Sequence, residues 1–426
     1  MATGSVAAPA VGARNSSGYQ ILLVVLLSLN FGIVFFDRNA LNFLMPFVKP
    51  ELGLSDTQVG LVASALSLTW SFAAFGMGRL SDSLGKRKLL LIVSTLAFSA
   101  CSFLTGIAAS FVMLLLARML MGIAEGGVMP ISHAMVASEV NPARRGLAQG
   151  VAQNFGSNLL GSFVAPVLLV SFAYAFGWRH AFFLAGIPGV VSAMLIWMLL
   201  KEPVMPKEAP KEAQDGSLAH VLKQRNIVVC MILSVLGVSY LVICWAFMPL
   251  WLTEVRHLDQ DTTNWVTATF GTSAPAWLMG TLGISATIGS FAIPALSDRI
   301  GRRPVMIAAP FIAVILPLGA LYYGGSLMVL GAIFFVGWVI NGIFPLFMAT
   351  VPSESVDAHH AATALGLAMG SGEVIGGAFG PTIAGFASDH LGRASPLWIM
   401  VGLAIATGIA ATFLRETAPS QVGKQA

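Results

Sequence analysis

Charged residues are scarce in this sequence of 426 residues: Asp, Glu, Lys and Arg make up 10% of it, whereas 56% is hydrophobic. An ordinary soluble domain is about 25% charged and about 45–50% apolar. A single water-soluble core cannot hold this excess of apolar side chains, so much of it must face lipid. The composition therefore excludes an ordinary soluble domain and favours a polytopic membrane protein.

Cysteine is scarce as well. The three cysteines, Cys101, Cys230 and Cys244, lie in apolar stretches without CxxC or metal-ligand spacing, and we interpret them as buried small hydrophobic residues. The sequence also lacks a Walker loop, an HExxH helix, a nucleophile elbow and any cluster of Cys and His. We therefore expect no catalytic residues, no metal and no cofactor. The formal charge of +4 is explained by basic loops, so we expect no nucleic-acid partner.

Long apolar runs recur between short polar breaks. A helix needs about 20 residues to cross about 30 Å of hydrocarbon, and the sequence predicts twelve such helices. They lie at 19–47, 57–79, 88–108, 111–137, 146–172, 180–200, 226–253, 273–296, 304–323, 326–350, 362–388 and 395–414. The first run carries Asp37 and Arg38 and is too long for the core of a signal peptide, so we expect it to stay in the mature protein.

The distribution of Lys and Arg predicts the orientation. With both termini in the cytoplasm, 17 of the 23 basic residues lie in inner loops and tails, and only Lys49, Arg179, Arg256 and Arg393 lie in outer loops. This asymmetry favours cytoplasmic termini in an integral, multi-pass protein of the inner or plasma membrane. We predict a disordered tail at 1–18, a six-helix bundle at 19–200, a cytoplasmic linker at 201–225, a second bundle at 226–414 and a tail at 415–426.

The chain repeats itself on either side of the linker. A segment that begins at Gly78 reads GRLSDSLGKRK, and one that begins at Pro294 reads PALSDRIGRRP. Each has an Asp, a Gly three residues later and a basic pair in a very short loop between two membrane helices. The members are Gly78, Asp82, Gly85 and Arg87 in the first copy, and Asp298, Gly301, Arg302 and Arg303 in the second. A duplicated six-helix unit is implied.

Motif, repeat, helix count and linker together make the sequence resemble the major facilitator superfamily over nearly the whole chain. The resemblance implies an all-α membrane fold of two six-helix bundles related by pseudo-two-fold symmetry. In the repeated loop, each Asp can cap a helix end and pair with a nearby Arg, latching the bundles together on the cytoplasmic side. The simpler interpretation is a loop that only obeys the positive-inside rule. Pro294 is a departure, because the loop of this family usually opens with Gly.

Five ionisable residues fall inside predicted membrane segments: Asp37, Arg38, Arg118, Glu125 and Glu373. A charge at the middle of a bilayer costs at least about 2.5 kcal/mol, so each is a functional candidate unless a partner explains it. Arg118 and Glu125 are seven residues apart, which returns them to the same helix face after two turns, and we expect them to face one cavity. The alternative is an ion-pair lattice that only holds helices together.

The strings around these residues sharpen the resemblance. FDRNALN, from Phe36, and EGGVMP, from Glu125, look like the anion:cation symporter branch, which includes proton-coupled sugar-acid and other organic-anion transporters. The resemblance implies that Arg38 faces the bound anion and that Asp37 and Glu125 take part in proton coupling. A guanidinium suits an anion because its planar donors match a carboxylate and its charge is permanent. EVNPARR, from Glu139, follows the branch only loosely.

Other classes stay open. FDR followed by LSDTQVGL, from Leu54, also looks like the spinster-type carriers of lysolipids or sphingoid phosphates. A proton-driven multidrug exporter or a channel would use intramembrane charges too. We favour a small carboxylate because Arg118 lies in register with Glu125, and alternating access because the gating loop is duplicated. The prediction is a secondary transporter, not an enzyme, that carries a small organic anion with protons and works in the lipid bilayer as a monomer.

Further side chains could line a central cavity. The candidates for substrate contact, beside Arg38 and Arg118, are Asn154, Asn158, Tyr240, Trp338 and Asn341. Each could equally serve packing, since Trp and Tyr are common in membrane helices for other reasons. Glu373 lies in a stretch of small residues and could be a third proton site, a substrate contact or a packing acid with a hydrogen bond.

Overall fold

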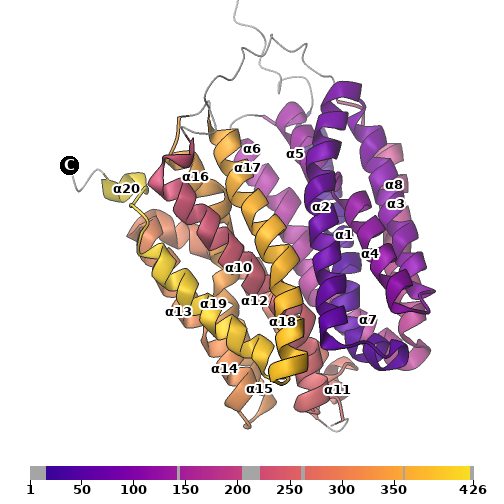
Figure 1. Cartoon of the computed structure of the whole chain (residues 1–426). Helices are drawn as coiled ribbons and strands as arrows, with labels where there is room; N and C mark the ends of the chain where they lie inside the picture. The colour runs from indigo at the N-terminus through magenta and orange to yellow at the C-terminus, as the bar shows by residue number, and fades with distance from the viewer. Residues whose placement is uncertain (1–15, 142–143, 204–220, 261–263, 358–359, 423–426) are drawn as a thin grey trace, which may run out of the picture.

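Helices make up every element of the computed structural model, which describes residues 16–141, 144–203, 221–260, 264–357 and 360–422. The N-terminal half contains α1 (Ser17–Leu52), α2 (Asp56–Leu84), α3 (Arg87–Gly106), α4 (Phe111–Glu125) with α5 (Val128–Glu139), α6 (Arg145–Gly150) with η2 (Val151–Phe155), η3 (Ser157–Val164) and α7 (Ala165–Phe176), and α8 (Trp178–Leu199). These form six continuous stretches of the bundle (Figure 1).

The C-terminal half repeats this layout. It contains α10 (Arg225–Leu250) with η4 (Trp251–Val255), a short α11 (Trp265–Phe270), α12 (Ala274–Ile300), α13 (Arg302–Ala313) with α14 (Ile315–Tyr322), α15 (Leu327–Gly337) with η5 (Trp338–Ile343), η6 (Leu346–Thr350) and α16 (Val351–Glu354), α17 (Ala361–Ser371) with η7 (Gly372–Gly377) and α18 (Ala378–Leu391), α19 (Ser395–Ala411) and α20 (Pro419–Val422). Ten stretches in the described part of the chain are long and apolar enough to cross a membrane. With α17–η7–α18 and α19 they confirm the predicted fold of twelve membrane helices.

The helices begin close to the predicted positions, but several run further at their ends. α1 continues to Leu52 and α2 to Leu84, beyond the apolar runs that the sequence marks. Each stops at a glycine in the left-handed region, Gly53 with φ 63° and Gly85 with φ 65°. A residue with a side chain is strained there, so glycine fixes where the helix ends.

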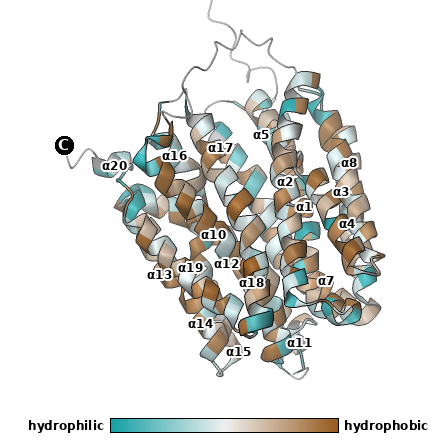
Figure 2. Cartoon of the chain, in the orientation of Figure 1, coloured by the Kyte–Doolittle hydropathy of each residue, from teal (hydrophilic) through white to brown (hydrophobic). Residues whose placement is uncertain are grey.

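The two ends of the bundle carry different elements. The backbone N–H of Lys201, just after α8, donates to the hydroxyl of Tyr19 in the first turns of α1 at 2.9 Å, so α1 begins where α8 ends. We call this the proximal end; α16 and α20 lie there, and α11 lies at the opposite, distal end (Figure 1). Large apolar side chains stay exposed on the outer surface, among them Trp197 of α8, Ile288 of α12 and Trp398 of α19. Figure 2 shows that hydrophobic residues occur along most of the length of the helices. This surface is suited to lipid.

The two halves meet along α2 and α18, whose backbones come very close together. A Cβ on Gly60 would lie 2.2 Å from the carbonyl oxygen of Pro381, and one on Gly385 would lie 2.2 Å from that of Asp56. Real Cβ atoms do not approach so closely, so both glycines are required for this crossing.

Part of the predicted domain division lies outside the described residues. These are 1–15, 204–220 and 423–426, in the predicted N-terminal tail, linker and C-terminal tail. The boundaries at 18, 200, 225 and 414 stay predictions. The three cysteines are buried and free, as their apolar surroundings predict.

Candidate functional site

Four of the five intramembrane ionisable residues come together between α1 and α4. Asp37 and Arg38 lie near the middle of α1, and α4 carries Arg118 and ends at Glu125, before Gly126 and Gly127 interrupt the helix. Arg38 Nη1 lies 4.0 Å from Glu125 Oε2. The predicted register of Arg118 and Glu125 on one face is consistent with this cluster, because both are buried there.

Arg38 is the member of the cluster that keeps free donors. Its side chain is 15% exposed, and its guanidinium lies 5.5 Å from the ring centroid of Phe35 and 5.4 Å from that of Trp70. Among the described residues, no acceptor lies within hydrogen-bond distance of the guanidinium, and the 4.0 Å approach to Glu125 is too long for such a bond. A cation held between aromatic faces with its donors available can take a carboxylate.

Arg118 has a different position. Its side chain is buried, Nη2 donates to the backbone carbonyl of Arg38 at 2.6 Å, and Nη1 lies 2.9 Å from the sulfur of Met121. The structure thus places Arg118 behind Arg38, where it holds the backbone of α1. A direct contact of Arg118 with a substrate would require this hydrogen bond to break.

Asp37 is fully buried and faces α3. Ser102 Oγ lies 2.6 Å from Asp37 Oδ1 and 3.0 Å from the carbonyl oxygen of Phe182. A serine hydroxyl has one proton, so it cannot donate fully to two acceptors. A protonated Asp37 resolves this, because the carboxyl then donates to Oγ and Oγ donates to Phe182. The geometry therefore accommodates a proton on Asp37.

Glu125 is more isolated than Asp37. Neither carboxylate oxygen has a hydrogen-bond partner in the described part of the chain, and both atoms are buried. An ionised carboxylate in such a place lacks the hydrogen bonds that normally offset its desolvation. The opposing charge of Arg38, 4.0 Å away, is its nearest compensation.

Glu373 approaches this cluster from the C-terminal half. It lies half-buried in η7 beside α2, because a Cβ on Gly377 would lie 3.0 Å from Ser67 of α2 and 3.4 Å from Glu373 Oε2. The irregular helices also hold Asn154 in η2 and Asn158 in η3, both half-buried, and Asn341 in η5. Such π and 3₁₀ segments often mark functional sites, because they expose backbone groups and turn side chains inward. Within the described residues, none of the three asparagine side chains forms a hydrogen bond with Arg38.

Tyr240 and Trp338 belong to a row of packed rings. Ring centroids are 6.1 Å apart for Tyr240 and Trp338, 5.3 Å for Trp338 and Trp245, and 5.6 Å for Trp245 and Phe43 of α1. The Tyr240 hydroxyl donates to the carbonyl of Ala313 at 3.0 Å, and Tyr240 and Trp338 are buried. In this conformation both contribute to packing between α10 and its neighbours.

The second copy of the repeated loop forms contacts within its own half. Arg302 Nη1 lies 2.5 Å from Asp298, and Nη2 lies 3.0 Å from Glu354. Gly301 has φ 108°, a backbone conformation that favours glycine and lets the chain turn within this very short loop. Arg303 Nη2 donates to the carbonyl of Thr412 at 2.9 Å. These bonds fasten α12, α13 and α16 to one another at the proximal end.

The first copy differs. Arg87 Nη1 donates to the carbonyl of Ala134 in α5 at 3.1 Å, and Gly85 ends α2. A Cβ on Gly78 would lie 3.9 Å from Pro130, an ordinary contact. The side chain of Asp82 lies outside what the structure describes. The latch between halves that the sequence suggested stays a prediction for a conformation closed at the proximal end.

A C-terminal strap, residues 416–421, covers the second loop. The backbone N–H groups of Arg302 and Arg303 donate to Glu416 at 2.8 and 3.1 Å. Ser420 and Gln421 donate to the backbone carbonyls of Asp298 and Arg299 at 2.6 and 2.7 Å. Glu416 therefore caps the start of α13, while the strap satisfies carbonyls at the end of α12.

A distal ion cluster, Lys49, Asp56, Glu254 and Arg393, joins the halves at the other end. Lys49 Nζ lies 2.6 Å from Asp56 Oδ1 and 2.9 Å from Glu254 Oε2, and Arg393 pairs with Glu254. Asp389 accepts the backbone N–H groups of Asp56 and Thr57 at 3.0 and 2.8 Å, which caps α2 from the opposite half. All hydrogen bonds found between the halves in the described residues lie toward this end, so the structure is closed distally.

Sequence reasoning missed several of these residues. Ser102, Phe35 and Trp70 carry no local signal, because only the tertiary fold brings them to Asp37 and Arg38. Lys49 and Asp56 did have a local signal in the sequence, because their opposite charges lie on either side of the turn that joins α1 to α2. No group of His, Cys, Asp and Glu able to hold a metal occurs among the residues that the structure describes.

The chain matches known transporters over nearly its whole length. A hexuronate transporter of Bacillus subtilis is 28% identical over 423 residues, which cover 95% of this chain and 97% of that protein. A probable sulfoacetate transporter of Cupriavidus necator is 25% identical over 420 residues, which cover 92% of each.

Solved structures share the fold. A bacterial homologue of the human lysosomal transporter Spinster has a TM-score of 0.66 at 18% identity, over 94% of this chain and 97% of that one. The nucleoside transporter NupG has a TM-score of 0.69 at 15% identity, over 92% and 98%. The sequence model of the family described as the Major Facilitator Superfamily matches residues 27–369 and 262–426 of this chain. Sequence, fold and relatives agree that this chain belongs to the major facilitator superfamily, as a multi-pass membrane transporter and not an enzyme.

Proposed function

We propose that this transporter carries a small organic anion together with protons. The single observation that supports this best is the guanidinium of Arg38, which is partly exposed, held over two aromatic rings and without an acceptor among the described residues. Two of the relatives, a hexuronate transporter and a probable sulfoacetate transporter, support an anionic substrate. A hexuronate is the first candidate.

In the proposed mechanism, the substrate carboxylate binds the guanidinium of Arg38 through two parallel hydrogen bonds. Arg118 acts as a positioning residue, because its hydrogen bond to the Arg38 carbonyl fixes the backbone that carries the Arg38 guanidinium. Asn154, Asn158 and Asn341 are candidates for the hydroxyl groups of the substrate, once the halves rearrange around it.

Proton coupling follows from the competition for Arg38. With substrate bound, Arg38 compensates Glu125 less, and the carboxyl holds a proton. Asp37 holds a second proton through Ser102, and Glu373 is the candidate third site on the opposite half. When the substrate leaves, Arg38 again compensates the carboxylates, and the carboxyl groups release their protons on the same side of the membrane. Substrate and protons therefore cross together.

For the topology, we propose cytoplasmic termini in the cell membrane, with bundles at 19–200 and 226–414 that rock as units in a functional monomer. The basic loops support this orientation. The distally closed structure then represents the state open toward the cytoplasm, and the repeated loops would latch the opposite state.

Reconstitution tests the proposal. Purified protein in liposomes with an acidic exterior should concentrate labelled glucuronate, and a protonophore that removes the pH difference should abolish the accumulation. Liposomes without protein and an equimolar neutral sugar serve as controls. Uptake of a lysolipid with no uptake of any organic acid, or accumulation of glucuronate that ignores the pH difference, would contradict anion symport or its proton coupling respectively.

A further inference from the structure

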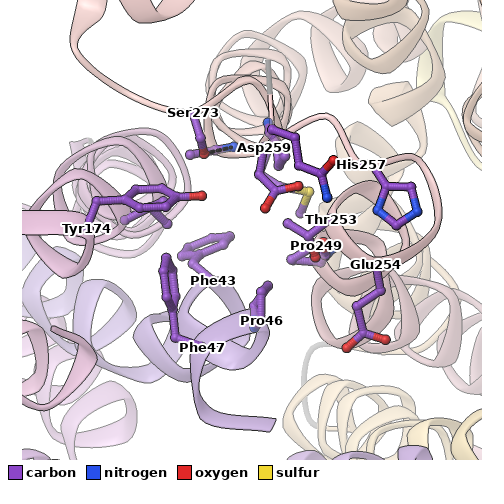
Figure 3. A pocket seen from close by; sticks show the side chains of 15 residues that line it. Phe43, Pro46, Phe47, Tyr174, Pro249, Thr253, Glu254, His257, Asp259 and Ser273 are labelled. Atoms are coloured by element: carbon purple, nitrogen blue, oxygen red, sulfur yellow. Dashed lines mark hydrogen bonds between the residues drawn. The ribbon is translucent and has the colours of Figure 1, made fainter. Parts of the chain in front are cut away.

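A cavity of about 340 Å³ opens at the distal end, between α1 and α7 of one half and η4 and α12 of the other. Its floor and one side are aromatic: Phe43, Phe47 and Tyr174 line it, and the rings of Phe47 and Tyr174 meet edge to face with centroids 5.0 Å apart. Figure 3 shows the Tyr174 hydroxyl pointing across the cavity toward Asp259. The volume suits a small organic ligand.

The acidic side chains of this cavity outnumber its basic ones. Glu254 and Asp259 line it together with the exposed His257, and no Lys or Arg occurs in its lining among the described residues. Glu254 is already paired with Lys49 and Arg393. Asp259 forms no ion pair within the described residues, and its buried Oδ1 has no hydrogen-bond partner there. Asp259 is thus a carboxylate without a cation, at the edge of an aromatic wall.

We propose that this distal cavity binds a small organic cation, of the quaternary ammonium type. Aromatic faces attract such a cation through their quadrupoles, and a carboxylate nearby adds a direct charge attraction. The same carboxylate repels an anion, so the cavity is separate in chemistry and in place from the Arg38 site. Its occupant would be an extracellular modulator, not the transported substrate.

Binding should also favour the distally closed conformation. The cavity exists only while α1 and α7 lie against η4 and α12, because each half supplies part of the wall. A ligand that binds one conformation shifts the population toward it. The cation should therefore slow opening of the distal end.

Choline provides the probe, and 3,3-dimethylbutan-1-ol, which has the same shape without the charge, provides the matched control. Choline should raise the melting temperature of the purified full-length protein in a saturable way, while the alcohol should not. Asp259→Asn should raise the choline dissociation constant about tenfold or more, and Tyr174→Leu should weaken binding as well. Asp357→Asn makes the same change of charge on an exposed residue at the proximal end and should leave choline binding unchanged.

Two results would overturn the proposal. One is an equal effect of choline and the uncharged alcohol, which would mean that the cavity has no preference for a cation. The other is unchanged choline affinity in both Asp259→Asn and Tyr174→Leu, which would place the choline elsewhere. Both variants lie on the distal surface, away from the Arg38 cluster, and their melting temperatures without ligand show directly whether they fold.

Discussion

The backbone and the side chain of Arg38 are held in different ways. Its backbone carbonyl accepts a hydrogen bond from Arg118, while in the described part of the chain its guanidinium meets only two aromatic faces and a carboxylate 4.0 Å away. In the mechanism that we propose, the fixed backbone pre-organises the guanidinium for an anion, so little entropy would be lost when the substrate binds.

Arg38→Lys tests the geometry of this site. Lysine keeps the charge but replaces the planar fork with a point charge, so we expect a loss of roughly 1.5–3 kcal/mol in substrate binding, or about 10- to 100-fold in apparent affinity. Uptake of labelled hexuronate measures it. Arg225→Lys, on an exposed arginine at the start of α10, should change nothing. Equal affinity in Arg38→Lys and wild type would make Arg38 structural.

Glu125→Gln separates proton coupling from scaffolding. The amide resembles the protonated acid but cannot release a proton, so uptake against a gradient should stop while exchange of labelled for unlabelled substrate survives. If Glu125 serves only to compensate Arg38 and Arg118, its neutralisation leaves buried arginines uncompensated, at a cost of about 3–5 kcal/mol, and the variant should melt early. A well-folded Glu125→Gln protein that still concentrates substrate would refute the coupling role.

The sequence could identify the charged residues of the cluster but not the different contacts that each of them makes. Hydrophobic surroundings alone single out Asp37, Arg38, Arg118, Glu125 and Glu373, since charges are costly there. It could not show that Arg118 bonds to the α1 backbone, because that depends on how α1 and α4 are rotated against each other. The same applies to Tyr240 and Trp338, because only the tertiary structure brings them into a row of packed aromatic side chains.

At the scale of helices, we expect the close crossing of α2 and α18 to control closure of the distal end. Gly60→Ala should place a Cβ against the Pro381 carbonyl and cost about 1–3 kcal/mol in the closed state, which shifts the equilibrium roughly 5- to 150-fold toward the distally open state. Ser64, whose hydroxyl lies 2.8 Å from that of Thr382 in this interface, is the reporter position.

The measurement is the rate at which a maleimide labels Ser64→Cys in a background without the three native cysteines. Gly60→Ala should increase this rate. Gly76→Ala is the matched control, because it lies in the same helix and a Cβ there meets nothing within 4 Å. If the two alanine variants label at the same rate, the crossing does not govern closure.

Helix positions were largely predictable because apolar length is a strong signal, and the ends were less so. The last turns of α2 and α12 contain polar and charged residues, so hydropathy misses them. Their stops at Gly85 and Gly301 can be recognised in the sequence, since the repeated loop contains both. The π and 3₁₀ segments have no sequence signal, as they depend on contacts with neighbouring helices.

For the whole molecule, the distal ion cluster predicts a bias between its two conformations. Lys49 is buried and bridges Asp56 and Glu254, so Lys49→Met leaves two carboxylates without their shared cation. We expect the closed state to lose about 3–5 kcal/mol, and labelling of Ser64→Cys to accelerate strongly. Lys223→Met, on an exposed lysine at the proximal end, should label like wild type. Slow labelling in Lys49→Met would show that the cluster is dispensable for closure.

The C-terminal strap limits how this protein can be engineered. A chain shortened to Leu414 would lose the cap on Arg302 and Arg303 and the donors to the carbonyls of Asp298 and Arg299. A purification tag or fluorescent reporter attached beyond Val422 leaves these bonds intact, whereas one fused directly after Leu414 replaces them with an unrelated sequence. A fusion after Leu414 should therefore have a less stable proximal end than a fusion after Val422. The two fusion proteins differ only in a short segment outside the twelve membrane helices.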